Sequence, residues 1–522
     1  MPLDGWPDTT GALPDESLPE GAAVDVATPG PDVDAIFDVI VVGSGAAGAV
    51  AAFRLAASGC SVAIVEEGPW IFSRDMKEDL LDGFRTLFRD AGMQALEGRA
   101  FMPLLQGRCV GGSTVINSAI AWRAPEEVLS DWAARFGVGP TMHELEPHYR
   151  ALEAELSVQP VADHVLGENN RRLLASRGFE SGGAGLEPSV MRRYDGGCEG
   201  SGRCLTGCPN GKKQSMNVTF VPRTLWRGAR IYFNANVSRV TFDGRRADGV
   251  LASGTGPEGR RVRLRARKAV VVAASTVQSP QLLRRSGIKN RHLGEHFQVH
   301  PGLALLGLFA DPIDMSFGAT QGAESVAYRK ERFKIEAISM PPGLVLARMP
   351  GVGPSLLERM RDYSHVAMWS IQVRGEAEGR VGRTLFGRER VTYSPTPRDM
   401  MTARYGLSVL ARLFFDAGAR EVWPGVHGLP PTLAPSDVGK VLGGPTDARA
   451  YSFIATHLFG AARMGPDAAS GVVDGDGLVY GTEGLYLVDS SVFPTNLGVN
   501  PQHTIMAIAS LLATRLADRM AR

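Results

Sequence analysis

The feature that most constrains this chain is a glycine-rich turn that follows its first apolar segment. IFDVIVVG, at Ile36–Gly43, is rich in β-branched residues and predicts a fully buried strand. Gly43, Gly45 and Gly48 follow in G-x-G-x-x-G spacing, and a helix of small residues leads to a second strand that ends at Glu66. In such a βαβ unit the glycines let backbone approach a pyrophosphate, and the acid bonds a ribose hydroxyl. The pattern therefore predicts a dinucleotide site that contains the three glycines and Glu66.

Composition narrows the remaining classes of protein. The chain has 522 residues, and its net charge of +1 gives no field that would attract nucleic acid or an anionic membrane. Hydrophobic residues make up 44%, and no apolar run reaches the roughly 18 residues of a membrane span, so we expect a globular protein without a transmembrane segment. Residues 1–34 are rich in Pro and Gly and lack the features of a signal peptide. They are expected to form a mobile tail, with the cytoplasm as the default location.

Four blocks further along the chain carry a second set of motifs. They are GRCVGGSTVINSAIA at Gly107–Ala121, STVQSPQLLRRSG at Ser275–Gly287, HLFGAARMG from His457, and LYLVDSSVFPTNLGVNPQHTIMAIA from Leu485. In this order they resemble the two signatures and the catalytic region of the glucose–methanol–choline (GMC) family of flavoprotein oxidoreductases. The second signature departs where Lys289 replaces a glycine. The resemblance covers residues 36–300 and 450–522, and it implies bound FAD rather than NAD.

The resemblance also implies how the chain is divided. We expect an α/β fold with a Rossmann-like FAD-binding domain and a discontinuous α+β substrate-binding domain. The FAD-binding domain is predicted to combine residues 35–160, 218–300 and 446–522. A Cys-rich loop segment at 161–217 lies between its parts, and residues 301–445, whose apolar segments are broken by Pro and Gly, are predicted to bind the substrate.

Two residues of the catalytic region are predicted to perform the chemistry. Oxidising an alcohol by hydride transfer to the flavin N5 requires a base for the hydroxyl proton, and His457 occupies the position of that base in the family pattern. Asn500 occupies the position of the second active-site residue, which is His or Asn in the family, and His503 is the weaker candidate for it. Asn500 and Pro501 also suit a helix start, with Asn at the N-cap and Pro at the first helical position.

Further flavin contacts follow from the resemblance. Ser113, Thr114 and Asn117 lie in the first signature, which runs beside the isoalloxazine ring in the family. Val237 resembles the residue whose backbone meets adenine, and Asp489 resembles the acid near the ribityl chain and the pyrophosphate. Each residue would also suit a turn or a core position, so these assignments depend on the family pattern.

A cluster of cysteines has no counterpart in these motifs. GCEGSGRCLTGCPNGKK contains Cys198, Cys204 and Cys208 in C-x5-C-x3-C-P spacing. Three is an odd number for disulfides and structural zinc normally takes four ligands, whereas an iron–sulfur cluster with three irons needs three thiolates. The spacing also resembles that of the iron–sulfur-bearing catalytic subunits of bacterial FAD sugar dehydrogenases in the same family. We therefore expect an iron–sulfur cluster, of the 3Fe-4S type; the alternatives are a disulfide with a free thiol, zinc, or no ligand.

Together these features predict an FAD-dependent alcohol dehydrogenase whose electrons leave through the cluster to an acceptor protein or a quinone. One alternative is an alcohol oxidase that uses O2 and has a merely structural cysteine loop. Another is a flavin-dependent lyase or isomerase. The apolar, Met-rich 301–445 segment favours an apolar or bulky alcohol, although a sugar is also compatible and core packing explains the same residues.

Overall fold

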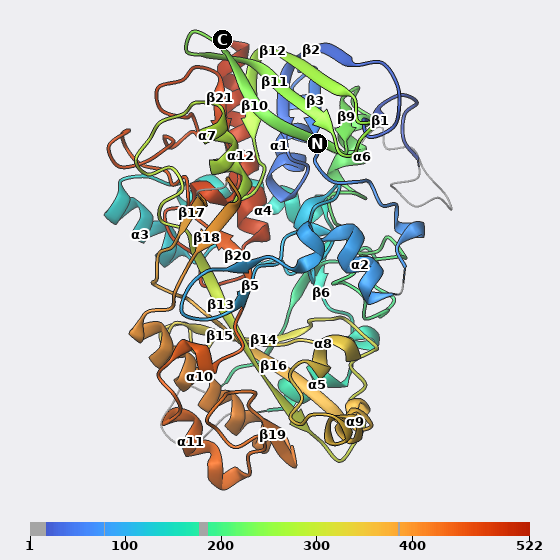
Figure 1. The fold of residues 1–522 in the computed structure, drawn as a ribbon, viewed down its shortest axis with the longest axis vertical. Coiled ribbons are helices and arrows are strands. Elements are labelled where there is room, and N and C mark those ends of the chain that lie inside the picture. Colours follow the sequence, from blue (N-terminus) through green and yellow to red (C-terminus); the bar gives the residue numbers. More distant parts are fainter. Residues whose placement is uncertain (1–16, 78, 177–185, 385–386) are drawn as a thin grey trace.

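The computed structural model describes residues 17–77, 79–176, 186–384 and 387–522. Two large β-sheets lie in opposite halves of the molecule, and helices pack around them (Figure 1). Each sheet has a hydrophobic core of its own. This arrangement agrees with the predicted α/β fold class, in which a Rossmann-like domain is joined to an α+β domain.

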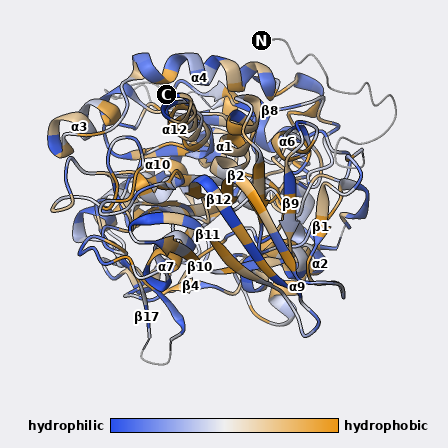
Figure 2. Ribbon diagram, turned by 90° about the horizontal axis from the view of Figure 1, so that it is seen from above, coloured by the Kyte–Doolittle hydropathy of each residue, from blue (hydrophilic) through white to orange (hydrophobic). Residues whose placement is uncertain are grey.

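The first sheet, in the upper half of Figure 1, is mostly parallel. Within the described residues its strands follow the order β1 (Ala23–Asp25), β9 (Arg230–Phe233), β3 (Val62–Val65), β2 (Val33–Val42), β12 (Arg261–Val272), β11 (Arg246–Gly254) and β10 (Ala235–Asp243), with β21 (Leu485–Leu487) paired to β12. The first part of β12 alternates exposed arginines with buried apolar residues, and its last four residues are fully buried. Hydrophilic and hydrophobic segments therefore succeed one another along these strands (Figure 2).

The carboxyl ends of the parallel strands place the predicted cofactor residues together. β2 pairs in parallel with β3 and β12, and β12 pairs in parallel with β21. Parallel strands end at one edge of a sheet, which is where α/β folds bind their ligands. Gly43 follows β2, Glu66 follows β3, Ser275 lies just after β12, and Asp489 lies just after β21.

The second sheet, in the lower half of Figure 1, is antiparallel. Its described strands are β19 (Glu421–Trp423), β13 (Gln298–Leu308), β16 (Val366–Val373), β15 (Phe333–Ala337), β14 (Ala323–Ser325) and β7 (Ser189–Val190), with β20 (Ile454–Phe459) paired to β13. Three two-stranded ribbons complete the sheet structure of the described residues: β4 (Ala95–Leu96) with β5 (Met102–Pro103), β6 (Val158–Pro160) with β8 (Arg192–Tyr194), and β17 (Arg380–Arg383) with β18 (Glu389–Thr392).

The helices connect and cover the two sheets. Those described are α1 (Ala46–Ala57), α2 (Leu80–Leu87), α3 (Glu126–Phe136), α4 (Met142–Glu155), α5 (Glu168–Ala175), α6 (Phe220–Leu225), α7 (Gln278–Arg285), α8 (Pro342–Leu346), α9 (Pro354–Met360), α10 (Pro397–Asp416), α11 (Val438–Leu442) and α12 (Gln502–Ala521). α1 and α12 lie side by side against the first sheet, and α10 packs on the second (Figure 1). No helix in the described ranges is long and apolar enough to cross a membrane.

Two segments differ from the predicted division of the chain. Residues 23–25, inside the predicted tail, form the short edge strand β1. This strand pairs in parallel with β9, which lies about 200 residues further along the chain. Residues 1–16 of that tail lie outside the described residues. β20, within the 446–522 segment assigned to the FAD-binding domain, pairs with β13 of the second sheet. The chain therefore stays in the second sheet through Phe459 and rejoins the first sheet at β21.

Candidate active site

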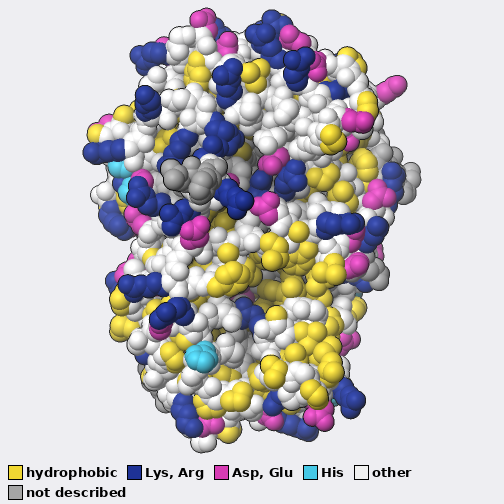
Figure 3. All heavy atoms as spheres, viewed as in Figure 1, with side chains coloured by type: hydrophobic (Ala, Val, Ile, Leu, Met, Phe, Trp, Pro, Cys, Tyr) yellow, Lys and Arg dark blue, Asp and Glu magenta, His cyan; other side chains and the backbone are white. Residues whose placement is uncertain are grey.

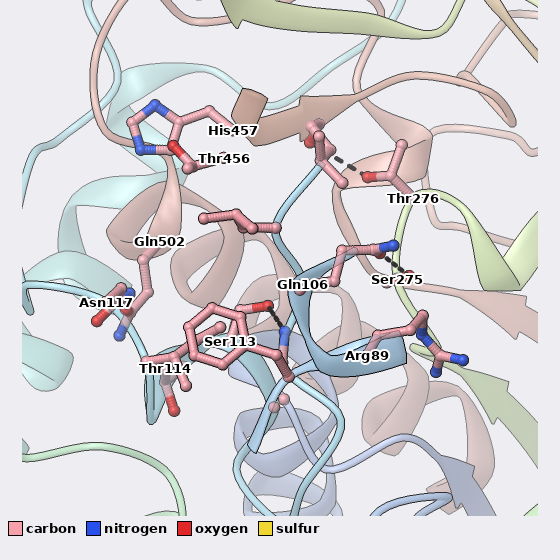
Figure 4. Close-up of a pocket in the computed structure, with 18 of the residues that line it drawn as sticks. Arg89, Gln106, Ser113, Thr114, Asn117, Ser275, Thr276, Thr456, His457 and Gln502 are labelled. Carbon is pink, nitrogen blue, oxygen red and sulfur yellow. Dashed lines mark hydrogen bonds between the residues drawn. The ribbon is translucent and has the colours of Figure 1, made fainter. Parts of the chain in front are cut away.

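A cavity of about 810 Å³ lies between the two sheets, and most of the predicted site residues line it. The glycine loop, the first signature and the carboxyl edge of the first sheet form one end, and β13, β15, β16 and β20 form the other. In Figure 4, His457 and Thr456 enter the pocket from the side opposite Arg89 and Ser275. The cavity thus connects the predicted dinucleotide loop with the predicted catalytic residues.

The three glycines of the loop have distinct roles. A Cβ on Gly43, whose φ is +100°, would collide with the carbonyl of Ala273, and a Cβ on Gly48 would collide with the carbonyl of Gly43. These two glycines therefore allow α1 to pack closely on the strand edge. Gly45 has nothing nearer than Gly112 Cα at 3.9 Å, so it leaves open space in the cavity wall. α1 begins there without a side-chain cap or an acid in its first turn, which leaves its N-terminus suited to a pyrophosphate.

Glu66 organises the loop as well as facing the cavity. Its Oε2 accepts hydrogen bonds from the Ser44 amide at 2.9 Å and the Ser44 hydroxyl at 2.7 Å, and its Oε1 accepts one from the Gly68 amide at 2.9 Å. Burial raises the pKa of this carboxyl group, and the hydrogen bonds act in the opposite direction. A carboxylate oxygen can accept more than one bond, so Glu66 keeps capacity for a ribose hydroxyl.

The first signature forms one wall of the cavity. Ser113 Oγ accepts a hydrogen bond from the Gly107 amide at 3.0 Å, and Thr114 Oγ1 donates to the Gly111 carbonyl at 2.7 Å. Asn117 Nδ2 donates to Gln502 Oε1 at 2.5 Å, which ties the signature to the start of α12. All three predicted residues, Ser113, Thr114 and Asn117, line the cavity.

Val237 and Asp489 also line the cavity. The carboxylate of Asp489 is already well supplied with donors: Oδ2 accepts from the Ser275 amide at 3.0 Å and the Ser279 hydroxyl at 2.5 Å, and Oδ1 accepts from the Ser491 amide at 2.9 Å. Asp489 therefore holds the turn after β12 against the turn after β21.

His457, on β20, lines the cavity, and His300 on β13 holds its ring. The two Nδ1 atoms lie 3.1 Å apart, which leaves Nε2 of His457 as the nitrogen available to a ligand. Gly498 N–H donates to Nε2 of His300 at 2.9 Å, so a neutral His300 carries its hydrogen on Nδ1, facing His457. In that arrangement a neutral His457 carries its own hydrogen on Nε2. Burial lowers the pKa of His457 to about 4, although the Glu336 carboxylate opposes this shift.

Asn500 lines the same cavity but does not cap α12. The expected helix start is wrong by one position, because the helix begins at Gln502 with Pro501 as its N-cap residue and without a side-chain cap. The Asn500 side chain bonds elsewhere: its Oδ1 accepts from Lys334 Nζ at 2.6 Å. His503, the weaker candidate, is fully buried beside Tyr149 and Tyr194, outside the residues that line the cavity.

A buried charged cluster next to Asn500 was not predicted from the sequence. Lys334 on β15 forms ion pairs with Glu324 at 2.5 Å and with Glu336 at 2.9 Å, and Glu336 lines the cavity. All three side chains are almost fully buried. A signal was present in FKIEA, where Lys334 and Glu336 alternate with apolar residues and so share one face of a strand.

The three clustered cysteines surround one small cavity, of about 20 Å³. Cys198 Sγ accepts from the Gly200 amide and Cys208 Sγ from the Lys213 amide, both at 3.4 Å, while Arg193 donates to Cys204 Sγ at 3.1 Å. Arg193 and Lys213 outweigh the effect of burial and lower the pKa of Cys204 to about 7. All five cysteines of the chain are unpaired thiols. Within the described part of the chain, no group of three or more His, Cys, Asp or Glu side chains is arranged to hold a single metal ion.

Lys213 joins the cysteine segment to the first signature. Its buried Nζ donates to the carbonyls of Cys204 at 2.6 Å, Val115 at 2.6 Å and Asn117 at 2.9 Å. Leu205, next to Cys204, lines the large cavity. The cysteines therefore lie directly behind the wall that carries Ser113, Thr114 and Asn117.

The chain matches the GMC oxidoreductase family models over residues 37–302 and 385–509. It is 34% identical to an uncharacterized GMC-type oxidoreductase of Mycobacterium tuberculosis, over 92% of this chain and 76% of the relative. A long-chain-alcohol oxidase of Arabidopsis thaliana is 27% identical over 92% of this chain and 67% of the relative. Paromamine 6'-oxidase of Streptomyces fradiae is 28% identical over 93% of this chain and 92% of the relative.

Solved structures share the fold. A formate oxidase structure superposes with a TM-score of 0.72 at 16% identity, covering 95% of this chain and all of the other. Pyridoxine 4-oxidase superposes with a TM-score of 0.68 at 18% identity, covering 92% and 98%. The cavity, the glycine loop with its open face at Gly45, and both family matches lead to one conclusion: the chain is a member of the GMC oxidoreductase family, and its cofactor is FAD.

Proposed function

We propose that this protein oxidises the hydroxyl group of an apolar alcohol. The observation that carries the proposal is that His457 and Asn500 share one cavity with the dinucleotide loop. Bound FAD would supply the hydride acceptor. Gly43, Gly45, Gly48, Glu66, Ser113, Thr114, Asn117, Val237 and Asp489 are the residues that we propose hold or shape its site.

His457 and Asn500 have different roles at the hydroxyl group of the substrate. Nε2 of His457 takes the hydroxyl proton, and Asn500 holds the oxygen. For this role His457 must carry its hydrogen on Nδ1 and donate it to Nδ1 of His300, which is the opposite tautomer from the one that the Gly498 contact favours. Reaching that tautomer moves the Nδ1 hydrogen of His300 to Nδ1 of His457. Nε2 of His457 then releases its proton to solvent, and Nε2 of His300 takes one up in place of the Gly498 contact. The Glu336 carboxylate, whose charge favours a protonated His457, stabilises the imidazolium that results.

The walls of the catalytic end favour an apolar substrate. Apolar side chains line this end, including Ile338, Met340, Leu344 and Phe453, and Phe84 and Phe101 line other parts of the same cavity. Hydrophobic side chains also gather around a hollow on the face shown in Figure 3. Three strongly exposed apolar residues belong to segments that also line the cavity: Leu81 is 76% exposed, Met93 82% and Phe101 75%. The relatives named long-chain-alcohol oxidases support the same substrate class.

The substrate class can be tested with an alcohol series. Anaerobic protein should lose its oxidised-flavin absorbance with primary alcohols, and kcat/KM should rise with chain length, because each buried CH2 adds about 0.8 kcal/mol of binding. Glucose serves as the polar control. A preference for glucose over 1-dodecanol would contradict the apolar assignment.

We also propose that Cys198, Cys204 and Cys208 hold an iron–sulfur cluster. Three thiols that face one small cavity, two backbone N–H···S hydrogen bonds and two buried cations are features that suit an anionic cluster. In a cluster each thiolate binds a different iron, so the sulfurs need not converge on a single ion. When present, the cluster would supply one-electron chemistry close to the flavin site, and the acceptor would be a protein or a quinone.

The first test of the proposed cluster is the iron and sulfide content of the protein, and the second is the rates of flavin reduction and of electron transfer to an acceptor. Anaerobically purified protein should contain iron and acid-labile sulfide, and Cys198→Ser, Cys204→Ser and Cys208→Ser should each lose both while keeping FAD. Cys60→Ser is the matched control, because Cys60 lies outside the cysteine cavity. The three variants should retain flavin reduction by alcohol but transfer electrons slowly to a one-electron acceptor.

The second candidate function is an O2-using alcohol oxidase with a structural cysteine loop. The relatives named alcohol oxidases favour it. Iron-free protein that forms one equivalent of hydrogen peroxide per alcohol oxidised would establish it. Protein that reduces an artificial acceptor and produces little peroxide would establish the dehydrogenase.

A further inference from the structure

A fully buried lysine stands behind the proposed catalytic asparagine. Lys334 Nζ lies 2.5 Å from Glu324 Oε2, 2.9 Å from Glu336 Oε1 and 2.6 Å from Asn500 Oδ1. It also lies 5.0 Å from the ring centroid of Trp122, whose indole N–H donates to Glu324. An ammonium group has three hydrogens and no lone pair, so these three acceptors use its full capacity.

This geometry fixes the orientation of the Asn500 amide. Because Lys334 can only donate, the amide atom that faces it must be Oδ1, and Nδ2 must lie on the other side. A hydrogen bond from Asn500 also contributes to the lowered pKa of Glu336, and only Nδ2 can donate it. Nδ2 carries two hydrogens. One therefore remains for a ligand in the cavity that Asn500 lines.

We propose that Lys334 is a positioning residue that holds Asn500 with its amide N–H toward the substrate oxygen. The inference deepens the proposed function and depends on it. An oxygen that accepts from Asn500 must direct its own hydrogen elsewhere, and His457 faces the same cavity. Lys334 thus determines, through Asn500, that the hydroxyl hydrogen points to the base. Without Lys334 the amide could turn over and present its acceptor oxygen instead.

The charges of the cluster allow a matched set of variants. One lysine and two glutamates give a formal charge of −1. Glu324→Gln removes a carboxylate but leaves the Lys334–Asn500 contact, whereas the double variant Glu324→Gln/Lys334→Met restores the charge of −1 and removes the contact. The comparison therefore separates the contact from the net charge. FAD content and thermal midpoint report whether each variant is folded.

The positioning role predicts a specific kinetic pattern for flavin reduction by 1-dodecanol. Asn500→Leu should lower kcat about a hundredfold, the scale seen when a donor to a reacting oxygen is removed. Glu324→Gln/Lys334→Met should lower kcat nearly as much, with KM little changed because the apolar chain still binds. Adding Lys334→Met and Glu324→Gln to Asn500→Leu should then cost little more.

Other outcomes would contradict the positioning role of Lys334. If the losses multiply in the triple variant, or if Glu324→Gln alone costs as much as the double variant, Lys334 does not act through Asn500. If Lys334→Met variants fail to fold, Asn500→Asp decides, because it keeps an acceptor for Lys334 but replaces the cavity-facing NH2 with oxygen. Its kcat should fall as in Asn500→Leu, and a wild-type kcat would overturn the inference. Failure of every alcohol to reduce the wild-type flavin would instead overturn the proposed function.

Discussion

Replacing Lys213 with Met should weaken the cysteine segment and the first signature together. The Lys213 ammonium donates to carbonyls on both segments: Cys204 on one, and Val115 and Asn117 on the other. Burial lowers the pKa of Lys213 to about 8, and the neighbouring thiols Cys204 and Cys208 oppose this shift. Met has nearly the same length but cannot donate, so the substitution leaves three carbonyl oxygens without this partner.

The structure gives the size of the effect. A buried acceptor that loses its partner costs about 1–3 kcal/mol, so three of them cost about 3–9 kcal/mol. Met avoids the desolvation of a buried ammonium, which offsets several kcal/mol of that cost. We therefore expect the free energy of unfolding to fall by about 3 kcal/mol. The loss should appear at both segments, because the same nitrogen serves both.

The assay is urea unfolding followed by flavin release, with iron content measured on the same samples. Lys212→Met is the matched control, because the Lys212 ammonium is 41% exposed and forms a 3.7 Å ion pair with Glu199. Such a surface substitution usually changes stability by less than about 0.5 kcal/mol. Equal stability, FAD content and iron content in the two variants would refute the bridging role of Lys213.

Two further predictions concern the base and the loop. Because burial lowers the pKa of His457 to about 4, the residue stays unprotonated at neutral pH, and kcat/KM should fall only as the pH drops through about 4. If kcat/KM instead falls at a pH near 6.5, the ordinary pKa of histidine, the result would contradict the buried site. Gly48→Val should abolish FAD binding, because its Cβ would collide with the Gly43 carbonyl. The control Gly439→Ala has open space around its Cβ and should bind FAD normally. FAD retained by Gly48→Val would contradict the packing role of Gly48.

Local patterns are enough to predict which residues gather at the dinucleotide end of the candidate site. The strand, the glycine turn and Glu66 lie within about thirty residues, and each part of that unit has its own sequence signal. The structure brings Ser113, Val237 and Asp489 to the same cavity, as the family resemblance implies. That resemblance supplied what local patterns could not, because these residues come together only at the edge of the folded sheet.

The features that local patterns do not predict depend on contacts between segments that are distant in the sequence. Three residues carry little strand signal, and the pairing of β1 with β9 cannot be seen locally. Asn500 was expected to cap α12, yet its oxygen bonds to Lys334, which is 166 positions earlier in the chain. His300 was missed for the same reason, since its partner His457 is 157 positions away. The cysteine spacing predicts three thiols at one centre, but it carries no signal for the Lys213 bridge to the first signature.

We propose that His457 takes a proton from the alcohol and that bound FAD would accept the hydride. The most direct measurement is the rate of anaerobic flavin reduction by 1-dodecanol in the wild-type protein and in His457→Ala, with both shown to contain equal FAD. Loss of a positioned base costs about a hundredfold to ten-thousandfold, so the variant should be slower by that factor and keep its flavin oxidised on the wild-type timescale. Reduction of both proteins at the same rate would contradict the claim and place the base elsewhere in the cavity.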